Sequence, residues 1–185
     1  MSELEQISLF GGNDPSSTPS LSNFDPSLIP MSASVPIPPG TYTSLDQLTE
    51  QCRQCQRCGL AAQRTHVVVS RGHPQAPVMV IGEGPGQQED ETGLPFVGRA
   101  GQLLEKILAA VRLDTDQDVY ICNIVKCRPP GNRVPTPDEA QACMPYLLEQ
   151  IRLVAPKIIL LTGATAVRGL TGNKLGFDGQ QTGDY

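Results

Sequence analysis

Short runs of β-branched residues alternate with amphipathic segments along most of this chain. Strands that alternate with helices form a parallel sheet with both faces covered. The sequence therefore predicts an α/β fold, a three-layer sandwich in which a mainly parallel sheet is flanked by helices. We expect strands at 65–70, 78–82, 118–125 and 157–163, and helices that begin near Ser44, Gly98, Thr136 and Gly163.

Several of these segments carry further signals. Ser44 with Gln47, three residues later, is typical of a capping box at a helix start. The helix that follows Thr136 is expected to break or kink at Pro145, and 157–163 is expected to be a buried strand. Five apolar residues of the helix at 98–112 form one stripe in the helical pattern: Leu103, Leu104, Ile107, Leu108 and Val111.

The first 43 residues differ in composition from the rest. They contain nine Ser, seven Pro, four acids and no base, which is typical of a disordered tail. No segment has the pattern of a signal peptide or is apolar enough to span a membrane, so we expect a cytoplasmic monomer with no membrane contact. The expected divisions are a tail at 1–43, an α/β domain at 44–174 and a divergent end at 175–185.

Positive charge is concentrated in two places, although the formal net charge is −5. The tail carries most of that negative charge, so the rest of the chain is nearly neutral. Two basic surfaces are compatible with binding a phosphate backbone, and solvated arginines on an ordinary surface are the alternative. The residues concerned are Arg53, Arg57, Arg64 and Arg71 in one segment and Lys126, Arg128 and Arg133 in the other.

A glycine-rich stretch, IGEGPGQQEDETGLPFVGRAG, follows the apolar run at 78–82. It lacks the Gly-Lys-Ser/Thr ending of a P-loop, and its glycines do not fit the dinucleotide fingerprint. The acids Glu89, Asp90 and Glu91 would repel a pyrophosphate. We therefore expect this loop to hold a ligand that is flat and neutral.

The six cysteines suggest a metal site or simple packing, because disulfides are rare in cytosolic proteins. Cys55 and Cys58 form one chelating pair, and Cys127 and Cys143 are candidates for a second pair. Spacing alone favours structural zinc over an iron-sulfur cluster. Cys122 is expected to be a small core residue.

Three longer stretches are similar to those of one enzyme family: GEGPGQQEDETGLPFVGRAGQLL, ICNIVKCRPPGNRVPTPDEAQAC and APKIILLTGATAV. With Cys55-x-x-Cys58 ahead of them, they closely resemble the family 4 uracil-DNA glycosylases. The resemblance implies hydrolysis of the N-glycosidic bond of uracil in DNA, which starts base excision repair. It also implies a structural 4Fe-4S cluster ligated by Cys55, Cys58, Cys127 and Cys143, in place of zinc.

The resemblance assigns roles to residues of the glycine-rich stretch and to Asn123 in the strand expected at 118–125. Phe96 would stack on a uracil flipped out of the duplex. The Asn123 amide would accept from uracil N3–H and donate to O4, a pattern that cytosine reverses. Glu83 and the backbone at Gly84 would position the attacking water. Glu89 would line the base site or organise the loop.

The chain departs from the family pattern at its end. Relatives carry a tryptophan-bearing segment and a His-Pro-x-x-x-Leu motif, and neither is present in these 185 residues. We therefore expect a C-terminally incomplete domain with impaired activity and an uncovered sheet edge. Two alternatives stay open: a catalytically inactive 4Fe-4S DNA-binding remnant, and a zinc-stabilised phosphate-binding protein.

One further motif lies in the tail. Gln6–Phe10, with the sequence QISLF, resembles the peptide by which bacterial repair and replication proteins bind the DNA polymerase sliding clamp. Leu9 and Phe10 would fill an apolar pocket, and Gln6 would make a polar anchor. An unstructured terminus with no partner is the alternative.

Overall fold

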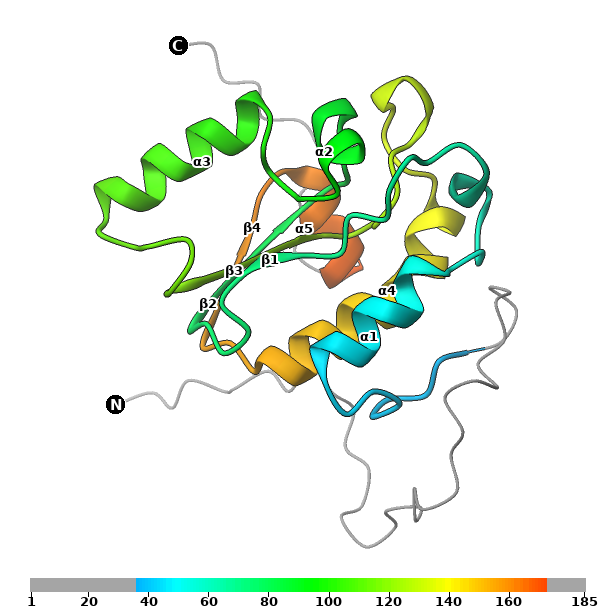
Figure 1. Ribbon diagram of the computed structural model, residues 1–185, viewed down its shortest axis with the longest axis horizontal. Helices are drawn as coiled ribbons and strands as arrows, with labels where there is room; N and C mark the ends of the chain where they lie inside the picture. The colour runs from blue at the N-terminus through cyan, green and yellow to red at the C-terminus, as the bar shows by residue number, and fades with distance from the viewer. Residues whose placement is uncertain (1–35, 173–185) are drawn as a thin grey trace, which may run out of the picture.

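The computed structural model describes residues 36–172; the Gln6–Phe10 motif and the end at 175–185 lie outside this range. Its centre is a four-stranded sheet with the strand order β1-β3-β2-β4 (Figure 1). β2 pairs in parallel with both β3 and β4, whereas β1 pairs antiparallel with β3. The predicted mainly parallel sheet is confirmed. The strands are β1 (Arg71–Gly72), β2 (Val78–Gly82), β3 (Val119–Asn123) and β4 (Ile158–Leu161).

Helices cover both faces of the sheet, so the predicted three-layer α/β architecture is also confirmed (Figure 1). On one face α1 (Leu45–Arg53) packs against α4 (Pro137–Val154), and α5 (Ala164–Thr171) follows β4. On the other face lies α3 (Arg99–Ala110). A short helix, α2 (Gln87–Thr92), interrupts the glycine-rich stretch where the sequence predicted only a loop. Two 3-10 turns complete the described elements, at Gly59–Ala62 and Pro130–Asn132.

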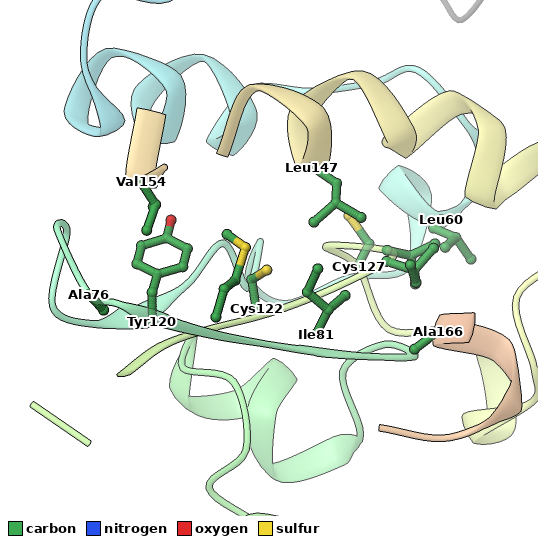
Figure 2. Close-up of a cluster of buried hydrophobic side chains, with 12 residues drawn as sticks. Leu60, Ala76, Ile81, Tyr120, Cys122, Cys127, Leu147, Val154 and Ala166 are labelled. Atoms are coloured by element: carbon green, nitrogen blue, oxygen red, sulfur yellow. The ribbon is translucent and has the colours of Figure 1, made fainter. Parts of the chain in front are cut away.

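The main core lies between the sheet and α4. Side chains alternate along a strand, so Ile81 and Cys122 face α4 while their neighbours face α3. Figure 2 shows Ile81 and Cys122 rising from the sheet toward Leu147 and Val154 of α4. The prediction that Cys122 is a small core residue is confirmed, because its side chain is fully buried.

The run at 65–70 is not a strand, contrary to the prediction. Val68 and Val69 are buried, and the Val68 amide donates to the Lys126 carbonyl over 2.8 Å. The amides of Thr65 and His66, however, donate to the carboxylate of Asp90, a buried residue of α2. Since those amides are already bonded to a side chain, regular sheet pairing is confined to β1.

Part of the predicted apolar surface is exposed. On α3, Leu104 and Leu108 are buried, whereas Leu103 is 59% exposed and Ile107 and Val111 are also exposed.

β4 was predicted to be buried, and this is wrong, because Ile158 is 61% exposed. β4 pairs only with β2 among the described strands, and α3 packs over β2 and β3 instead. One helix therefore cannot cover that face as far as the edge strand.

α4 is continuous through Pro145, so of the predicted break or kink at this residue the break is wrong. A proline removes one backbone donor, and a helix tolerates that loss where tertiary packing holds both of its halves. Here Ala142 and Leu147, on either side of Pro145, are both buried. The predicted helix start at Thr136 is confirmed, because the Thr136 side chain accepts from the Glu139 amide at the start of α4.

The segment before α1 is packed against the domain. Ile37 and Tyr42 are buried, and the Tyr42 ring stacks on Tyr146 of α4 with 6.2 Å between centroids. The packed structure therefore begins before residue 44, the start expected from the sequence. Glu149, which is 3% exposed, fastens this segment by accepting from the amides of Gly40 and Tyr42.

Replacing Glu149 with Gln is expected to lower the free energy of unfolding by about 1–3 kcal/mol, because a single amide oxygen replaces two charged acceptors. Burial acts to raise the pKa of Glu149, but hydrogen bonds from Arg152, Gly40 and Tyr42 outweigh it and hold the pKa below its usual range. The folded state therefore favours the charged carboxylate. This contribution is present above the ordinary glutamate pKa of about 4.3 and is lost as the pH falls through the folded value.

Urea unfolding at neutral and acidic pH would measure this effect. The difference between wild type and Glu149→Gln should be largest near neutral pH and should shrink in acid. Glu50→Gln is the matched control, because Glu50 is exposed and lies 3.9 Å from Arg53. Such surface pairs contribute about 0–1 kcal/mol. Equal losses for the two variants at neutral pH would contradict the role given to Glu149.

Candidate active site and cysteine cavity

The glycine-rich loop and Asn123 meet at the carboxyl ends of two neighbouring parallel strands. Gly82 ends β2, Asn123 ends β3, and the two residues are direct partners in the register. A Cβ atom on Gly82 would lie 2.5 Å from Asn123 Oδ1 and 2.5 Å from Phe96 Cζ. The amide of Asn123 and the ring of Phe96 therefore converge over Gly82, and only a residue without a side chain leaves room for both.

Asn123 is 2% exposed, and within the described residues no group is hydrogen-bonded to its side-chain amide. Buried amides are normally paired, because an unpaired buried donor or acceptor costs about 1–3 kcal/mol. The Asn123 amide also lines an open pocket. Both its donor and its acceptor are therefore available to a ligand.

Phe96 is held in an unusual backbone conformation. Its φ is 56°, in the left-handed region that a bulky residue rarely adopts. The guanidinium of Arg71 donates to the carbonyls of Pro95 and Phe96, over 2.8 and 3.2 Å, and also pairs with Glu105 over 2.6 Å. The ring is only half-buried and lines the same pocket as Asn123. The clamp at Arg71 thus fixes the backbone that carries the Phe96 ring at the pocket.

Four of the five residues predicted for the base site line this pocket: Gly84, Glu89, Phe96 and Asn123. Glu83 is not among the lining residues, although its carbonyl accepts from the Val125 amide over 3.2 Å. The other lining residues are Gly86, Gln87, Gln88, Gly98, Arg99 and Ala100.

Glu89 braces the rim of the pocket. One carboxylate oxygen accepts from the amides of Val97 and Gly98, and the other accepts from the amide of Gly86. Because both oxygens are bonded to the main chain, Glu89 shapes the loop around Phe96. Asp90 does the same on the other side of α2 through Thr65.

A second cavity is lined by thiols. Cys55 and Cys58 come from the segment after α1, Cys127 from the segment after β3, and Cys143 from α4. All four of the predicted metal ligands therefore line one cavity, and Cys52 of α1 lines it as well. None of these cysteines forms a disulfide.

Comparison with known proteins identifies the family. A model of the uracil DNA glycosylase superfamily matches residues 69–183, which is more than half of the chain. The chain belongs to the uracil-DNA glycosylase superfamily. This confirms the resemblance seen in the sequence.

Two relatives in this superfamily are named type-4 uracil-DNA glycosylases. The protein from Thermotoga maritima is 48% identical over 123 residues, 66% of this chain and 64% of that protein. The protein from Sulfurisphaera tokodaii is 47% identical over 121 residues, 65% of this chain and 54% of that protein. A DNA polymerase of Bacillus phage SP01 is 39% identical over 101 residues, 11% of its length. The matched part of the chain spans less than two thirds of the type-4 relatives.

Nitrogen donors contact two of the sulfur atoms in the cysteine cavity, one of them from the positively charged side chain of Arg64. Arg64 donates to Cys127 Sγ over 3.5 Å and to the Cys55 carbonyl over 2.6 Å. The Arg57 amide donates to Cys55 Sγ over 3.5 Å. Such N–H···S bonds stabilise thiolates, the form in which cysteine binds iron or zinc.

Without a metal, burial favours the neutral thiol at Cys127 and Cys143. It raises the pKa of Cys143 to about 12 and that of Cys127 to about 11, with Lys126 and Arg64 respectively opposing the effect. Metal binding would therefore release protons. Within residues 36–172, no three His, Cys, Asp or Glu side chains are placed to share one metal ion. A four-iron cluster has a different requirement, because each thiolate binds its own iron.

Several residues of the predicted basic surfaces make contacts within the protein. Arg57 and Lys126 are buried, Arg71 clamps Phe96, and Arg133 pairs with Glu139 over 2.7 Å. Arg57 and Lys126 are therefore not part of an exposed basic surface, whereas for the exposed Arg53 and Arg133 that interpretation stays a prediction. Arg99, by contrast, is exposed and lines the pocket that contains Asn123.

Sequence reasoning assigned no place at the base pocket to Gly82, Arg71 or Lys126, although it named Arg71 and Lys126 among the basic residues. The glycine spacing gave a signal for Gly82, since it directly follows the β2 run. No local pattern marks Arg71 as the partner of Phe96, because the two are 25 residues apart and meet only in the folded chain.

Within the described range, no helix is long and apolar enough to cross a bilayer.

Proposed function

We propose that this protein is a uracil-DNA glycosylase that hydrolyses the N-glycosidic bond of uracil in DNA. The observation that carries the proposal is the convergence of the Phe96 ring and the unpaired Asn123 amide over Gly82. An aromatic face beside a buried amide suits a flat, neutral base that has been flipped out of the duplex. The names of the type-4 relatives support the same activity.

In this proposal Phe96 stacks on the uracil, and Asn123 accepts from N3–H and donates to O4. Cytosine presents the reverse pattern, and leaving the buried amide unpaired costs about 1–3 kcal/mol for each lost bond. Glu83 and the main chain at Gly84 position the water that attacks the sugar. Glu89 contributes by holding the loop that carries Phe96.

We further propose that Cys55, Cys58, Cys127 and Cys143 hold a 4Fe-4S cluster. Such a cluster would cross-link α4 to the segments after α1 and β3, a structural role. The proposed partners are uracil-containing DNA and, through Gln6–Phe10, a bacterial sliding clamp.

The activity is tested with the full chain and labelled oligonucleotides that contain uracil, thymine or cytosine at one position. We expect selective binding of the uracil strand, and alkaline cleavage then reports excision. Asn123→Ala should reduce the uracil preference by about tenfold or more, the equivalent of one lost buried hydrogen bond.

Gln102→Ala is the matched control, because Gln102 is an exposed amide on α3 away from the pocket lining. Selective binding without excision would favour the alternative of an inactive DNA-binding protein. No preference for uracil in wild type, or an unchanged preference in Asn123→Ala, would refute the assignment.

A further inference from the structure

Lys126 is a buried cation without a carboxylate partner among the described residues. Its side chain is 1% exposed, and its ammonium donates to the carbonyl oxygen of Asn123 over 2.6 Å. None of the ion pairs within residues 36–172 includes it. Burying an ammonium is costly unless an opposite charge lies nearby. The position of Lys126 therefore calls for a negative group.

The thiol cavity lies where such a group would be. Lys126 lines that cavity together with Cys127 and Cys143. Burial raises the pKa of Cys52 and Cys143, and the charge of Lys126 opposes it at both, so its field reaches the thiols. Four thiolates around a 4Fe-4S cluster carry a net negative charge, and Lys126 would balance part of it.

The same residue also fixes the base site. After β3 the chain runs beside the glycine-rich loop, with the amides of Ile124 and Val125 donating to Gly82 and Glu83. Lys126 then reaches back to the Asn123 carbonyl, while its own carbonyl accepts from Val68 over 2.8 Å. The backbone that carries the Asn123 amide is thus held by a side chain from the cysteine cavity.

We propose that Lys126 is a positioning residue that couples the metal–thiolate centre to base recognition. Its ammonium is the counter-charge of the loaded centre, and its hydrogen bond to Asn123 fixes the amide that reads the base. The inference rests on the proposed function. It adds that loss or a charge change of the centre alters uracil selectivity, although no cysteine lines the base pocket.

The test compares three variants of the full chain, purified with the metal centre loaded. Lys126→Met keeps the length but removes the charge and the donor. Lys126→Arg keeps the charge but changes the geometry of the hydrogen bond. Arg64→Met removes a cation that contacts Cys127 but has no bond to Asn123. The readouts are the reduction potential of the centre and the ratio of affinities for uracil and thymine strands.

Removing a cation beside a redox centre disfavours adding an electron, so Lys126→Met and Arg64→Met should both shift the potential to more negative values. Only Lys126→Met should also lower the uracil preference, by about tenfold, since it alone loses the bond to Asn123. Lys126→Arg should keep the potential near that of wild type. If Lys126→Met does not fold, Lys126→Arg is the variant in which the potential and the uracil preference are measured.

Three results would overturn the inference. The counter-charge role would be excluded if the reduction potential were unchanged in Lys126→Met. It would also be excluded if Lys126→Arg, which keeps the charge, shifted the potential as much as is expected for Lys126→Met. A uracil preference that falls equally in Arg64→Met and the Lys126 variants would point to general damage instead of coupling. Failure of the proposed function is distinguishable, because wild type itself would then lack iron or a preference for uracil.

Discussion

Cys58→Ala is expected to lose most of its bound iron and sulfide, and with them the visible absorbance and much of its resistance to denaturant. Cys58 begins the 3-10 turn at Gly59–Ala62, a segment that contributes only Leu60 to the main core. A cluster bound to Cys58 would tie this segment to β3 and α4. Because metal binding is coupled to folding, loss of one ligand should affect both. Iron and sulfide analysis and urea unfolding would measure the two effects.

Cys122→Ala is the matched control, since Cys122 is a buried cysteine of β3 that does not line the thiol cavity. It should keep its iron and lose about 1 kcal/mol of stability, as expected for a modest core truncation. Cys52→Ala should also keep its iron, although Cys52 borders the cavity. A full cluster in Cys58→Ala would rule out that ligand. Stoichiometric zinc without iron in wild type would restore the zinc interpretation.

Gly82→Ala is expected to reduce the preference for uracil over cytosine by about 10- to 100-fold, which corresponds to the loss of one or two buried hydrogen bonds. The added methyl group would lie 2.5 Å from both the Asn123 oxygen and the Phe96 ring. Real Cβ atoms do not approach other atoms this closely, so the amide and the ring must move apart. Binding measured with matched oligonucleotides gives the preference directly.

Overpacking at Gly82 also costs stability, about 1–3 kcal/mol, so the readout is a ratio of affinities measured below the unfolding transition. Gly59→Ala is the control, because a Cβ on Gly59 would meet no atom within 4 Å. It should leave the preference unchanged. An unchanged preference in Gly82→Ala would mean that Asn123 and Phe96 do not read the base together.

Local signals in the sequence were sufficient for many elements of this fold. The helix starts at Ser44 and Thr136 depend on residues three apart, and each cap side chain accepts from the amide of the third residue. The reciprocal bond of a full capping box is present at Thr136, whereas the Gln47 side chain accepts from Thr43 in place of Ser44. β2 and β3 are short apolar runs whose ends were placed correctly at Gly82 and near Asn123. Parallel pairing then brings those ends to one edge of the sheet, so the meeting of the loop with Asn123 could be expected.

Other features depended on contacts between distant segments, which no local pattern encodes. The run at 65–70 has strand composition, yet the carboxylate of Asp90 binds its first amides. β4 reads as a buried strand, yet it lies at the edge of the described sheet, beyond the reach of α3. Propensity and periodicity describe each segment alone, whereas burial depends on which neighbour covers it.

The sequence by itself determined the alternating α/β order, the residues of the base loop and the set of cysteines. Only the tertiary structure decided how they work together: Arg71 holds Phe96 at a positive φ, Gly82 leaves room for the ring and the amide, and Lys126 joins the thiol cavity to Asn123. The physical reason is that these roles come from geometry and charge across the fold. A residue's type and spacing specify what it can bond to, and folding selects the partner.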